Sequence, residues 1–292
     1  MRYPVLRNFA FVFICQRGRL EIESLLLAAS LKRFLRGEFE LIAAVPTSIE
    51  LLGEPRPTTL ELLRRLGVRI AKVCNEILEE TPSREVPYLL TNKIFSLRVT
   101  TTAEKLVVLD SDQIGRREFL PAPHLRAPLS ARRADFVSSR DVGTAWEQVF
   151  QAAGAELPSL RIRVPAPPDE AGADVYAPPS FNSSFVAIDA ALAADFSRLW
   201  EDCFRRIDRA GALDQARYYQ EQASLAVAAH KSQIAYEMLD LQHINPCLAH
   251  YIRPQRVQTD PQLLEVARSL VRELTGIDEI IRDQPDWHFL LT

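Results

Sequence analysis

The stretch Lys105-Leu-Val-Val-Leu-Asp-Ser-Asp112 joins a short apolar run to two carboxylates. Side chains of an extended backbone alternate between faces, so Asp110 and Asp112 can point the same way if the extended geometry continues past Leu109. Open α/β sheets bind their ligands at the carboxyl ends of parallel strands. Two hard oxygen ligands at such an end suit a divalent cation, which is often paired with a diphosphate. The alternative interpretation is an acidic turn that caps the next element.

Strand-like and helix-like periods alternate around this stretch. Before it, the pattern predicts strands at 9–15, 39–45 and 68–73 and helices at 20–35, 59–66 and 88–101. After the strand at 105–109, it predicts strands at 134–138 and 181–189 and helices at 144–153, 191–208 and 214–229. A last helix is expected between the N-cap Asp260 and Gly276. This alternation predicts an α/β fold, with a mostly parallel sheet flanked by helices in a single domain.

One segment interrupts the alternation. Six prolines within residues 156–180 rule out a continuous helix and indicate a long surface loop. We therefore expect three parts of one domain, which are residues 1–155, residues 156–256, and a C-terminal helix and tail at 257–292.

The composition is that of an ordinary soluble globular protein, with 47% hydrophobic and 25% charged residues. The 35 basic and 38 acidic residues give a net charge of −3 and no basic stripe, so no nucleic-acid partner is expected. The four cysteines lie far apart without a CxxC pair, which indicates neither a zinc cluster nor a disulfide framework. Small buried residues of a reducing compartment explain them best.

The chain ends carry apolar runs that need an interpretation. Arg2 and Arg7 precede the apolar run 9–15, as basic residues do in a signal peptide. The residues that follow the run, Gln16-Arg17-Gly18-Arg19, are not a cleavage site of small residues, so we expect a buried first strand. No segment has the roughly 20 apolar residues of a membrane span, which predicts a cytoplasmic protein without a transmembrane segment. The aromatic run 287–291 is expected to pack on its own domain, and docking on a partner, a second subunit of a homo-oligomer or a membrane surface is the alternative.

Further residue groups, in chain order, extend the pattern set by the two aspartates. They are Lys93, Asp110-Ser-Asp112, Phe181-Asn-Ser-Ser184, Glu221-Gln222 and His250-Tyr251. This order resembles the GT-A nucleotide-sugar glycosyltransferases, and within that fold the group containing glycogenin and the bacterial lipopolysaccharide galactosyltransferases. The resemblance spans residues 9–256. It implies that residues 1–155 form a nucleotide-sugar-binding half of the domain and residues 156–256 an acceptor and catalytic half. It implies a GT-A (Rossmann-like) fold and a metal-dependent glycosyltransferase.

The resemblance implies a metal site made by Asp110, Asp112 and His250. Mixed carboxylate and imidazole ligation favours Mn²⁺, for which Mg²⁺ can substitute. Such a cation neutralises the nucleoside diphosphate that departs from its sugar. The donor is then a nucleoside-diphosphate sugar, expected to be a UDP-sugar, and the acceptor is an unknown glycan, lipid or protein. The alternative for His250 is a hydrogen-bonded, half-buried side chain beside Tyr251.

The resemblance also implies donor contacts by cationic side chains and by Asp110. Lys93 and Arg84 correspond to residues that contact the donor sugar and its phosphates in the family. Arg256 falls where the family has a phosphate-binding Lys, and it offers a planar fork in place of a point charge. For each of the three cations, the alternative is a solvated surface side chain.

The sugar side of the site is expected on two segments. Asn182 and Ser183 would face the donor sugar or the acceptor. Glu221 and Gln222 stand where the retaining enzymes of the group carry Asp-Gln beneath the anomeric centre. A carboxylate or amide there could stabilise an oxocarbenium-like species during transfer.

The chain departs from the family pattern in several places. Glu221 is one methylene longer than the usual Asp, Ala226 replaces an Asn, and Ser184 replaces a Gly, so its Cβ could crowd the site. Gln16 could hydrogen-bond a base edge, but the Tyr that stacks on uracil in the family has no counterpart. Uridine is therefore an expectation from the family alone, and guanosine stays open.

Other functions compete with this interpretation. The departures at Glu221 and Ser184 favour a degenerate GT-A domain that binds a nucleotide sugar or serves as a scaffold. A metal-dependent nucleotidyltransferase would need a Gly-rich phosphate loop after the first strand, where the chain offers Gly18 alone. A haloacid-dehalogenase-like phosphatase would carry the two aspartates on its first strand, whereas several βα elements precede them here.

Overall fold

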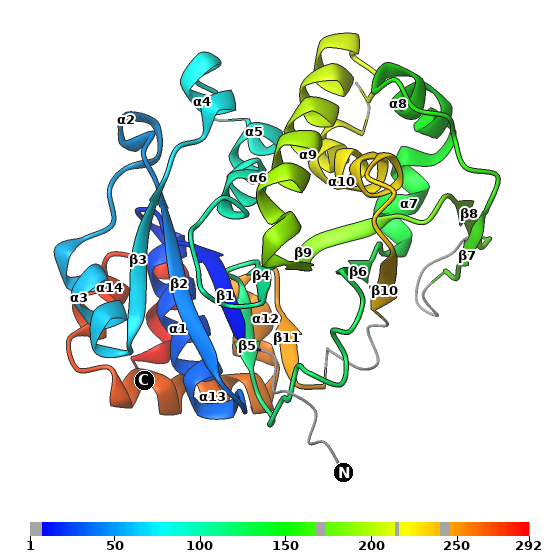
Figure 1. Cartoon of the computed structure of the whole chain (residues 1–292). Helices are drawn as coiled ribbons and strands as arrows, with labels where there is room; N and C mark the ends of the chain where they lie inside the picture. The colour runs from blue at the N-terminus through cyan, green and yellow to red at the C-terminus, as the bar shows by residue number, and fades with distance from the viewer. Residues whose placement is uncertain (1–7, 84, 167–172, 214–215, 240–245, 292) are drawn as a thin grey trace.

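The computed structural model describes residues 8–83, 85–166, 173–213, 216–239 and 246–291, and all structural statements below concern these residues (Figure 1). Arg84, a predicted donor contact, lies outside them. No helix of the described chain has the length and apolar character that are needed to cross a membrane.

Seven strands form the central sheet. Their spatial order is β10 (Tyr236–Leu239), β6 (Leu129–Arg133), β9 (Phe181–Asp189), β4 (Lys105–Leu109), β1 (Phe9–Ile14), β2 (Phe39–Pro46) and β3 (Val68–Val73). Neighbouring strands pair in parallel except at β9, which is antiparallel to both β4 and β6. The predicted mostly parallel sheet is therefore confirmed, with one reversed strand beside β4.

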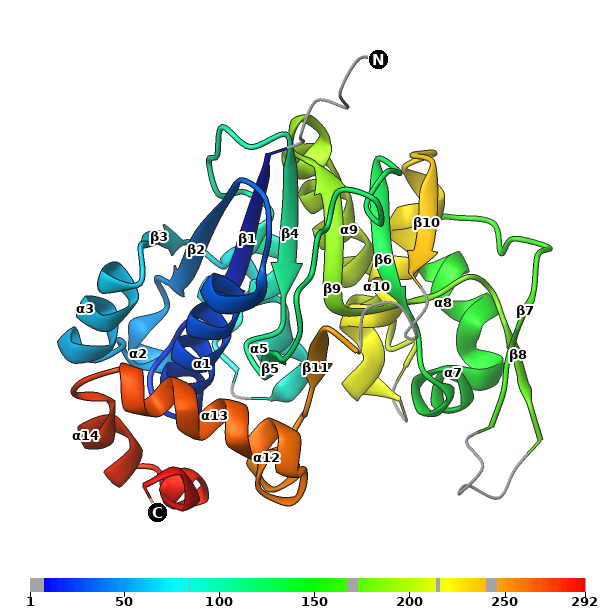
Figure 2. The same ribbon diagram turned by 90° about the horizontal axis from the view of Figure 1, so that it is seen from below.

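Helices cover both faces of the sheet (Figures 1 and 2). One face carries α1 (Arg19–Phe34), α3 (Pro57–Arg65), α12 (Pro254–Thr259), α13 (Pro261–Glu273) and α14 (Ile277–Arg282). The other carries α6 (Asn92–Ser96), α8 (Trp146–Ala152), α9 (Ala190–Ala210) and α10 (Gln220–Lys231). Alternate residues of β1 enter the two cores: Phe11 faces the first group of helices and Val12 the second. Burial on both faces explains why β1 is a continuous apolar run.

The predicted helix at 88–101 is wrong in its extent. The chain instead forms two short helices, α5 (Val86–Leu90) and α6, and a loop follows α6 to β4. Thr91, between the helices, donates its hydroxyl proton to Tyr88 O and accepts a hydrogen bond from Asn75 Nδ2. Such side-chain bonds compete with the helix ladder, which explains the break. Lys93 nevertheless lies on a helix that precedes β4.

The predicted strand at 134–138 is also wrong. β6 ends at Arg133, and α7 (Phe136–Val142) begins three residues later. The carboxylate of Asp135 accepts a hydrogen bond from Ser138 N at 2.8 Å, which makes it the N-cap of α7. An Asp before an apolar residue is a helix start signal, and this signal outweighs the apolar pattern that suggested a strand.

Two other boundaries differ from the sequence-based prediction. The proline-rich segment contains an antiparallel pair, β7 (Ile162–Val164) and β8 (Val175–Ala177), in place of an uninterrupted loop. The predicted start of the helix at 214 lies outside the described residues, and within them a 3₁₀ turn, η2 (Arg217–Tyr219), precedes α10. The predicted N-cap Asp260 is confirmed, since its side chain accepts hydrogen bonds from Gln262 N and Leu263 N. Among the cysteines, Cys15 and Cys203 are buried as expected, whereas Cys74 is exposed and Cys247 half-buried.

The aromatic end of the chain packs on its own domain, as predicted. Trp287 lies in the 3₁₀ helix η3 (Pro285–Leu290), has no exposed surface and belongs to the core beneath α1. Its ring meets that of Tyr251 edge to face, with the centroids 5.8 Å apart. The tail therefore supports the segment that carries His250.

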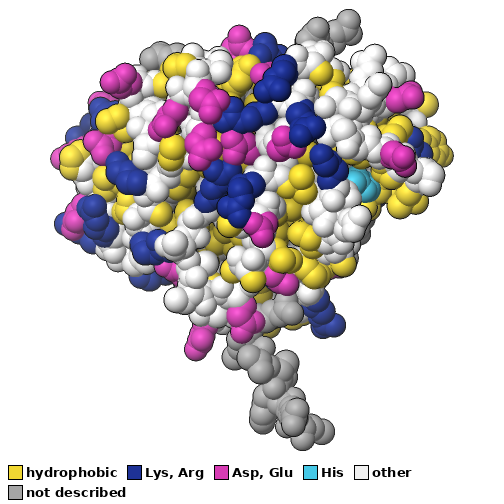
Figure 3. Space-filling view, turned by 45° about the horizontal axis from the view of Figure 1, so that its top comes forward, with side chains coloured by type: hydrophobic (Ala, Val, Ile, Leu, Met, Phe, Trp, Pro, Cys, Tyr) yellow, Lys and Arg dark blue, Asp and Glu magenta, His cyan; other side chains and the backbone are white. Residues whose placement is uncertain are grey.

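The face that carries α4 (Glu76–Glu80) and α9 mixes charges of both signs (Figure 3). Arg205 of α9 pairs with Glu80 of α4 at 2.6 Å and with Glu201 on its own helix at 2.8 Å. Positive and negative side chains lie next to one another across the face drawn in Figure 3, so this face offers no extended patch of one sign.

Candidate active site

A two-stranded ribbon joins the two segments that carry the predicted metal ligands. Asp110 and Asp112 directly follow β4, and the chain continues as β5 (Gln113–Gly115), which pairs antiparallel with β11 (Leu248–His250). His250 is the register partner of Gln113, and Tyr251 N donates a hydrogen bond to Asp112 O at 3.1 Å. The ribbon thus holds His250, which is distant in sequence, beside the carboxyl end of β4.

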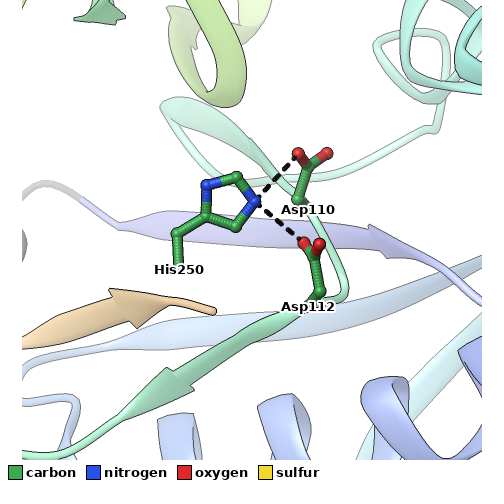
Figure 4. A group of neighbouring side chains, drawn as sticks. All are labelled: Asp110, Asp112 and His250. Carbon is green, nitrogen blue, oxygen red and sulfur yellow. Dashed lines mark ion pairs between the residues drawn. The ribbon is translucent and has the colours of Figure 1, made fainter. Parts of the chain in front are cut away.

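Asp110, Asp112 and His250 form one compact group (Figure 4). His250 Nε2 lies 3.1 Å from Asp112 Oδ1 and 3.7 Å from Asp110 Oδ2. One potential ligand atom of each residue lies within 4.8 Å of the others. Two carboxylates and an imidazole are a donor set that fits Mn²⁺ or Mg²⁺. In the described chain, no other trio of His, Cys, Asp and Glu side chains meets this proximity.

Lys93 compensates part of the negative charge of this group. Its Nζ lies 2.5 Å from Asp110 Oδ1, and its side chain is nearly buried. Burial alone would lower the pKa of Lys93, but Asp110 and Glu221 raise it above its ordinary value. Burial would likewise raise the pKa of Asp112, whereas the hydrogen bond and charge of His250 and the charge of Lys93 lower it. Both Lys93 and Asp112 are therefore charged at neutral pH.

A chain of polar contacts runs from Asp110 through the site to α10. Beyond Asp110, Lys93 Nζ donates to Ser183 Oγ at 3.1 Å, and Ser183 Oγ donates to Glu221 Oε2 at 2.7 Å. Glu221 is fully buried, and its Oε1 meets no hydrogen-bond donor among the described residues. Burial raises the pKa of Glu221 to about 7, although Lys93 and Ser183 oppose the rise. Three elements, α6, β9 and α10, thus share one hydrogen-bonded chain.

The buried carboxyl of Glu221 predicts a pH dependence of stability. Its pKa is about 7 in the folded protein against an ordinary value of 4.5, so the native state binds more protons than the unfolded chain between these values. Its contribution to stability is therefore lost as the pH rises through about 7. We expect the free energy of unfolding of the wild-type protein, measured with a chelator present, to fall by about 2–3 kcal/mol relative to that of Glu221→Gln between pH 5 and pH 8. Urea unfolding of both proteins at each pH measures this difference, and a constant difference would contradict the prediction.

The start of β9 fixes the backbone beside the group. Asn182 is nearly buried; its Oδ1 accepts from Ser184 N at 2.9 Å, and its Nδ2 donates to Asp135 Oδ2 at 3.3 Å. Ser184 O accepts from Asp110 N at 3.0 Å and from Gln113 Nε2. Alternation along the strand separates Asn182 and Ser184 from Ser183, which explains why only Ser183 joins the chain to Glu221.

The remaining predicted residues do not join this bonded network. Gln16 and Gln222 are half-buried, and each has a buried Oε1 without a hydrogen-bond partner in the described structure. Buried polar atoms are normally satisfied, so an unpartnered oxygen at each of these two amides is unusual. Arg256 is exposed on α12, and its positive charge lowers the pKa of the half-buried Arg132.

Two charged residues of the site escaped sequence analysis. Arg132 of β6 places its Nη1 3.2 Å from His250 Nδ1. Glu23 of α1 is fully buried and pairs with Arg19 at 3.2 Å; burial raises the pKa of Glu23, and the charges of Asp112 and Asp110 add to the rise. Neither residue belongs to a motif. The available signal for Glu23 was a carboxylate within the apolar stripe of a helix.

The model of the Rhodobacterales glycosyltransferase domain family matches residues 11–233, which is most of the chain. The chain belongs to this glycosyltransferase family. No curated protein sequence matches this glycosyltransferase. The predicted glycosyltransferase activity is confirmed by the family match.

Solved structures match this glycosyltransferase at low sequence identity. The galactosyltransferase LgtC, solved with donor and acceptor sugar analogues, matches with a TM-score of 0.57 and 14% identity, over 94% of this chain and 99% of that one. Apo mouse xyloside xylosyltransferase 1 matches with a TM-score of 0.44 and 12% identity, over 80% and 86% of the two chains. The likeness to LgtC confirms the predicted GT-A fold.

Proposed function

We propose that this glycosyltransferase transfers a sugar from a nucleoside-diphosphate sugar with the help of a divalent cation held by Asp110, Asp112 and His250. The observation that carries the proposal is the compact three-ligand group at the carboxyl end of β4. Ligands of open α/β sheets bind at this end of the strands. The nearly buried Lys93 beside Asp110 supports the same location for the diphosphate.

The departing nucleoside diphosphate carries the negative charge that the site has to balance. A Mn²⁺ or Mg²⁺ ion supplies Lewis-acid neutralisation of that charge when it is bound. Lys93 contributes a fixed positive charge, since its pKa is raised and its ammonium is held between Asp110 and Ser183. Arg256, exposed on α12, would add a planar fork to a phosphate that reaches the same edge.

We assign the base and the sugar to the two amides that have unpartnered oxygens. Gln16 follows β1, and its buried Oε1 could accept a hydrogen bond from an N–H group of the base. Uridine diphosphate is the expected carrier because of the family resemblance. Gln222 opens α10, and its Oε1 would contact the sugar near the anomeric centre. We propose that Asn182 and Ser183, at the start of β9, contact the donor sugar or the acceptor.

Transfer with retention of configuration is proposed from the position of Glu221 and Gln222. A carboxylate and an amide beside the anomeric carbon stabilise positive charge that develops there. Glu221 is fully buried and bonded to Ser183, so it would act on the site through Ser183 and Lys93, and Gln222 would make the direct contact. The acceptor would approach the anomeric carbon while these groups position the donor.

A thermal-shift comparison of UDP and GDP, each with Mn²⁺, Mg²⁺ or a chelator, tests the proposal. We expect UDP with Mn²⁺ to stabilise the protein by about 2.7 kcal/mol at a hundredfold excess over its dissociation constant. Mn²⁺ alone and UDP with chelator should give much smaller shifts. Stabilisation by GDP equal to that by UDP would remove the uridine assignment. If neither nucleotide stabilises the protein with either cation, the donor site is wrong.

A further inference from the structure

Arg132 lies directly behind the imidazole of His250. The pairing of β6 with β9 shifts register between Ala131 and Arg132, and such irregularities redirect side chains. From this position, Arg132 Nη1 lies 3.2 Å from His250 Nδ1 and 3.4 Å from Ser184 Oγ. The carboxylates of Asp135, Asp110 and Asp112 attract the guanidinium to this place.

The contact fixes which nitrogen of His250 carries the proton. A guanidinium has only N–H donors and stays protonated, so the Nδ1 atom that faces Arg132 has to accept the hydrogen bond. The proton of the neutral imidazole is then on Nε2. Nε2 lies 3.1 Å from Asp112 Oδ1, and so His250 donates to Asp112 while it accepts from Arg132.

A cation bound by His250 Nε2 needs the opposite arrangement. The lone pair of Nε2 must face the metal, and the proton must lie on Nδ1. A metal-ligating His normally donates that second N–H to a carboxylate, a backbone carbonyl or water, none of which is a guanidinium. The positive charge of Arg132 also repels a divalent cation. The observed hydrogen bond from Arg132 to His250 Nδ1 therefore cannot be present while His250 Nε2 binds a cation.

We propose that Arg132 is a positioning residue that holds His250 in a metal-free arrangement and has to release it before a cation is bound. This inference rests on the proposed metal site. An incoming diphosphate offers the guanidinium a new anionic partner, because Arg forms bidentate hydrogen bonds with phosphate. Cation and nucleoside diphosphate then bind cooperatively, since each favours the released state of Arg132.

Titration of Mn²⁺ alone, followed by the electron paramagnetic resonance signal of the free ion at pH 8, tests the proposal. In Arg132→Gln, the amide oxygen can accept the Nδ1–H of a metal-bound imidazole, so the dissociation constant for Mn²⁺ should fall about tenfold or more. Arg133→Gln is the matched control. It removes the same charge from the next residue, whose guanidinium bonds the carbonyl of Arg163, and it should bind Mn²⁺ like wild type.

The tautomer of His250 gives a second measurement that needs no stable Arg132 variant. In metal-free wild type at pH 8, the ¹⁵N shifts of labelled histidine should show a proton on Nε2 of His250. A proton on Nδ1, or equal Mn²⁺ affinities of wild type and Arg132→Gln, would overturn the role of Arg132 and leave the metal site intact. If Mn²⁺ binds neither protein, the metal site itself is wrong, and the inference fails with it.

Discussion

Replacing Asp112 with Asn is expected to abolish the Mn²⁺-dependent binding of UDP while the fold is preserved. The amide has the size of the carboxylate and its Oδ1 can still accept the hydrogen bond from His250 Nε2, but it lacks the negative charge that a divalent cation needs. The backbone carbonyl that receives the hydrogen bond of Tyr251 is unchanged. Loss of one of three ligands should weaken UDP binding with Mn²⁺ by about a hundredfold or more. Isothermal titration with UDP, with and without Mn²⁺, measures the loss.

Asp135→Asn is the matched control for this experiment. It removes a carboxylate from the same neighbourhood, and Asn can still cap α7, because Asn and Asp are equivalent N-cap residues. Its binding of UDP should keep its dependence on Mn²⁺. Should Asp112→Asn retain wild-type metal dependence as well, Asp112 is not a ligand.

Truncation of Gln222 to Ala should lower turnover by about 10²–10³-fold with little change in donor affinity. The amide would interact most strongly with the positive charge that develops at the anomeric carbon in the transition state, so its removal lowers kcat more than donor affinity. Glu221→Gln keeps the shape of the side chain and removes the charge that reaches Lys93 through Ser183, so its effect should also fall on kcat. Steady-state release of UDP from a UDP-sugar, with or without an acceptor, measures both.

Gln220→Ala serves as the control on the same helix. Gln220 is buried, but its amide bonds Asp208 on α9, away from the polar chain of the site, so kcat should stay close to that of wild type. If the loss in Gln222→Ala and Glu221→Gln is confined to donor affinity, both residues are ordinary binding contacts. If neither variant alters transfer or hydrolysis, catalysis depends on other residues.

The parts of the fold that the sequence predicts are those with a strong local period. Continuous apolar runs predict the strands at 9–15 and 105–109, because both faces of these strands are buried. The capping residue Asp260 predicts the helix that follows it. The errors occur where the hydrogen bonds of a single polar side chain decide where a helix begins or ends. Thr91 divides a helix by bonding Tyr88 O, and Asp135 starts a helix where a strand was expected. Periodicity alone does not contain these bonds.

The candidate site divides in the same way. The proximity of Asp110 and Asp112 follows from their spacing after an apolar strand, whereas His250 was expected beside them only because of the family resemblance. The contact of Arg132 with His250 could not be predicted from the sequence, because it depends on the register shift between β6 and β9 that brings the guanidinium to the imidazole. The complete burial of Glu221 likewise depends on the packing of α10 against β9, which no local pattern specifies.

The packing of Trp287 against Tyr251 has a genetic consequence. Tyr251 is the residue after His250, so the last turn of the chain braces a reacting site that it does not touch. A premature stop codon shortly before Trp287 would spare every residue proposed here to meet the cation or the nucleotide sugar. We still expect it to behave as a loss-of-function allele, because Tyr251, the residue after His250, would lose the packing of Trp287 that keeps the imidazole in place.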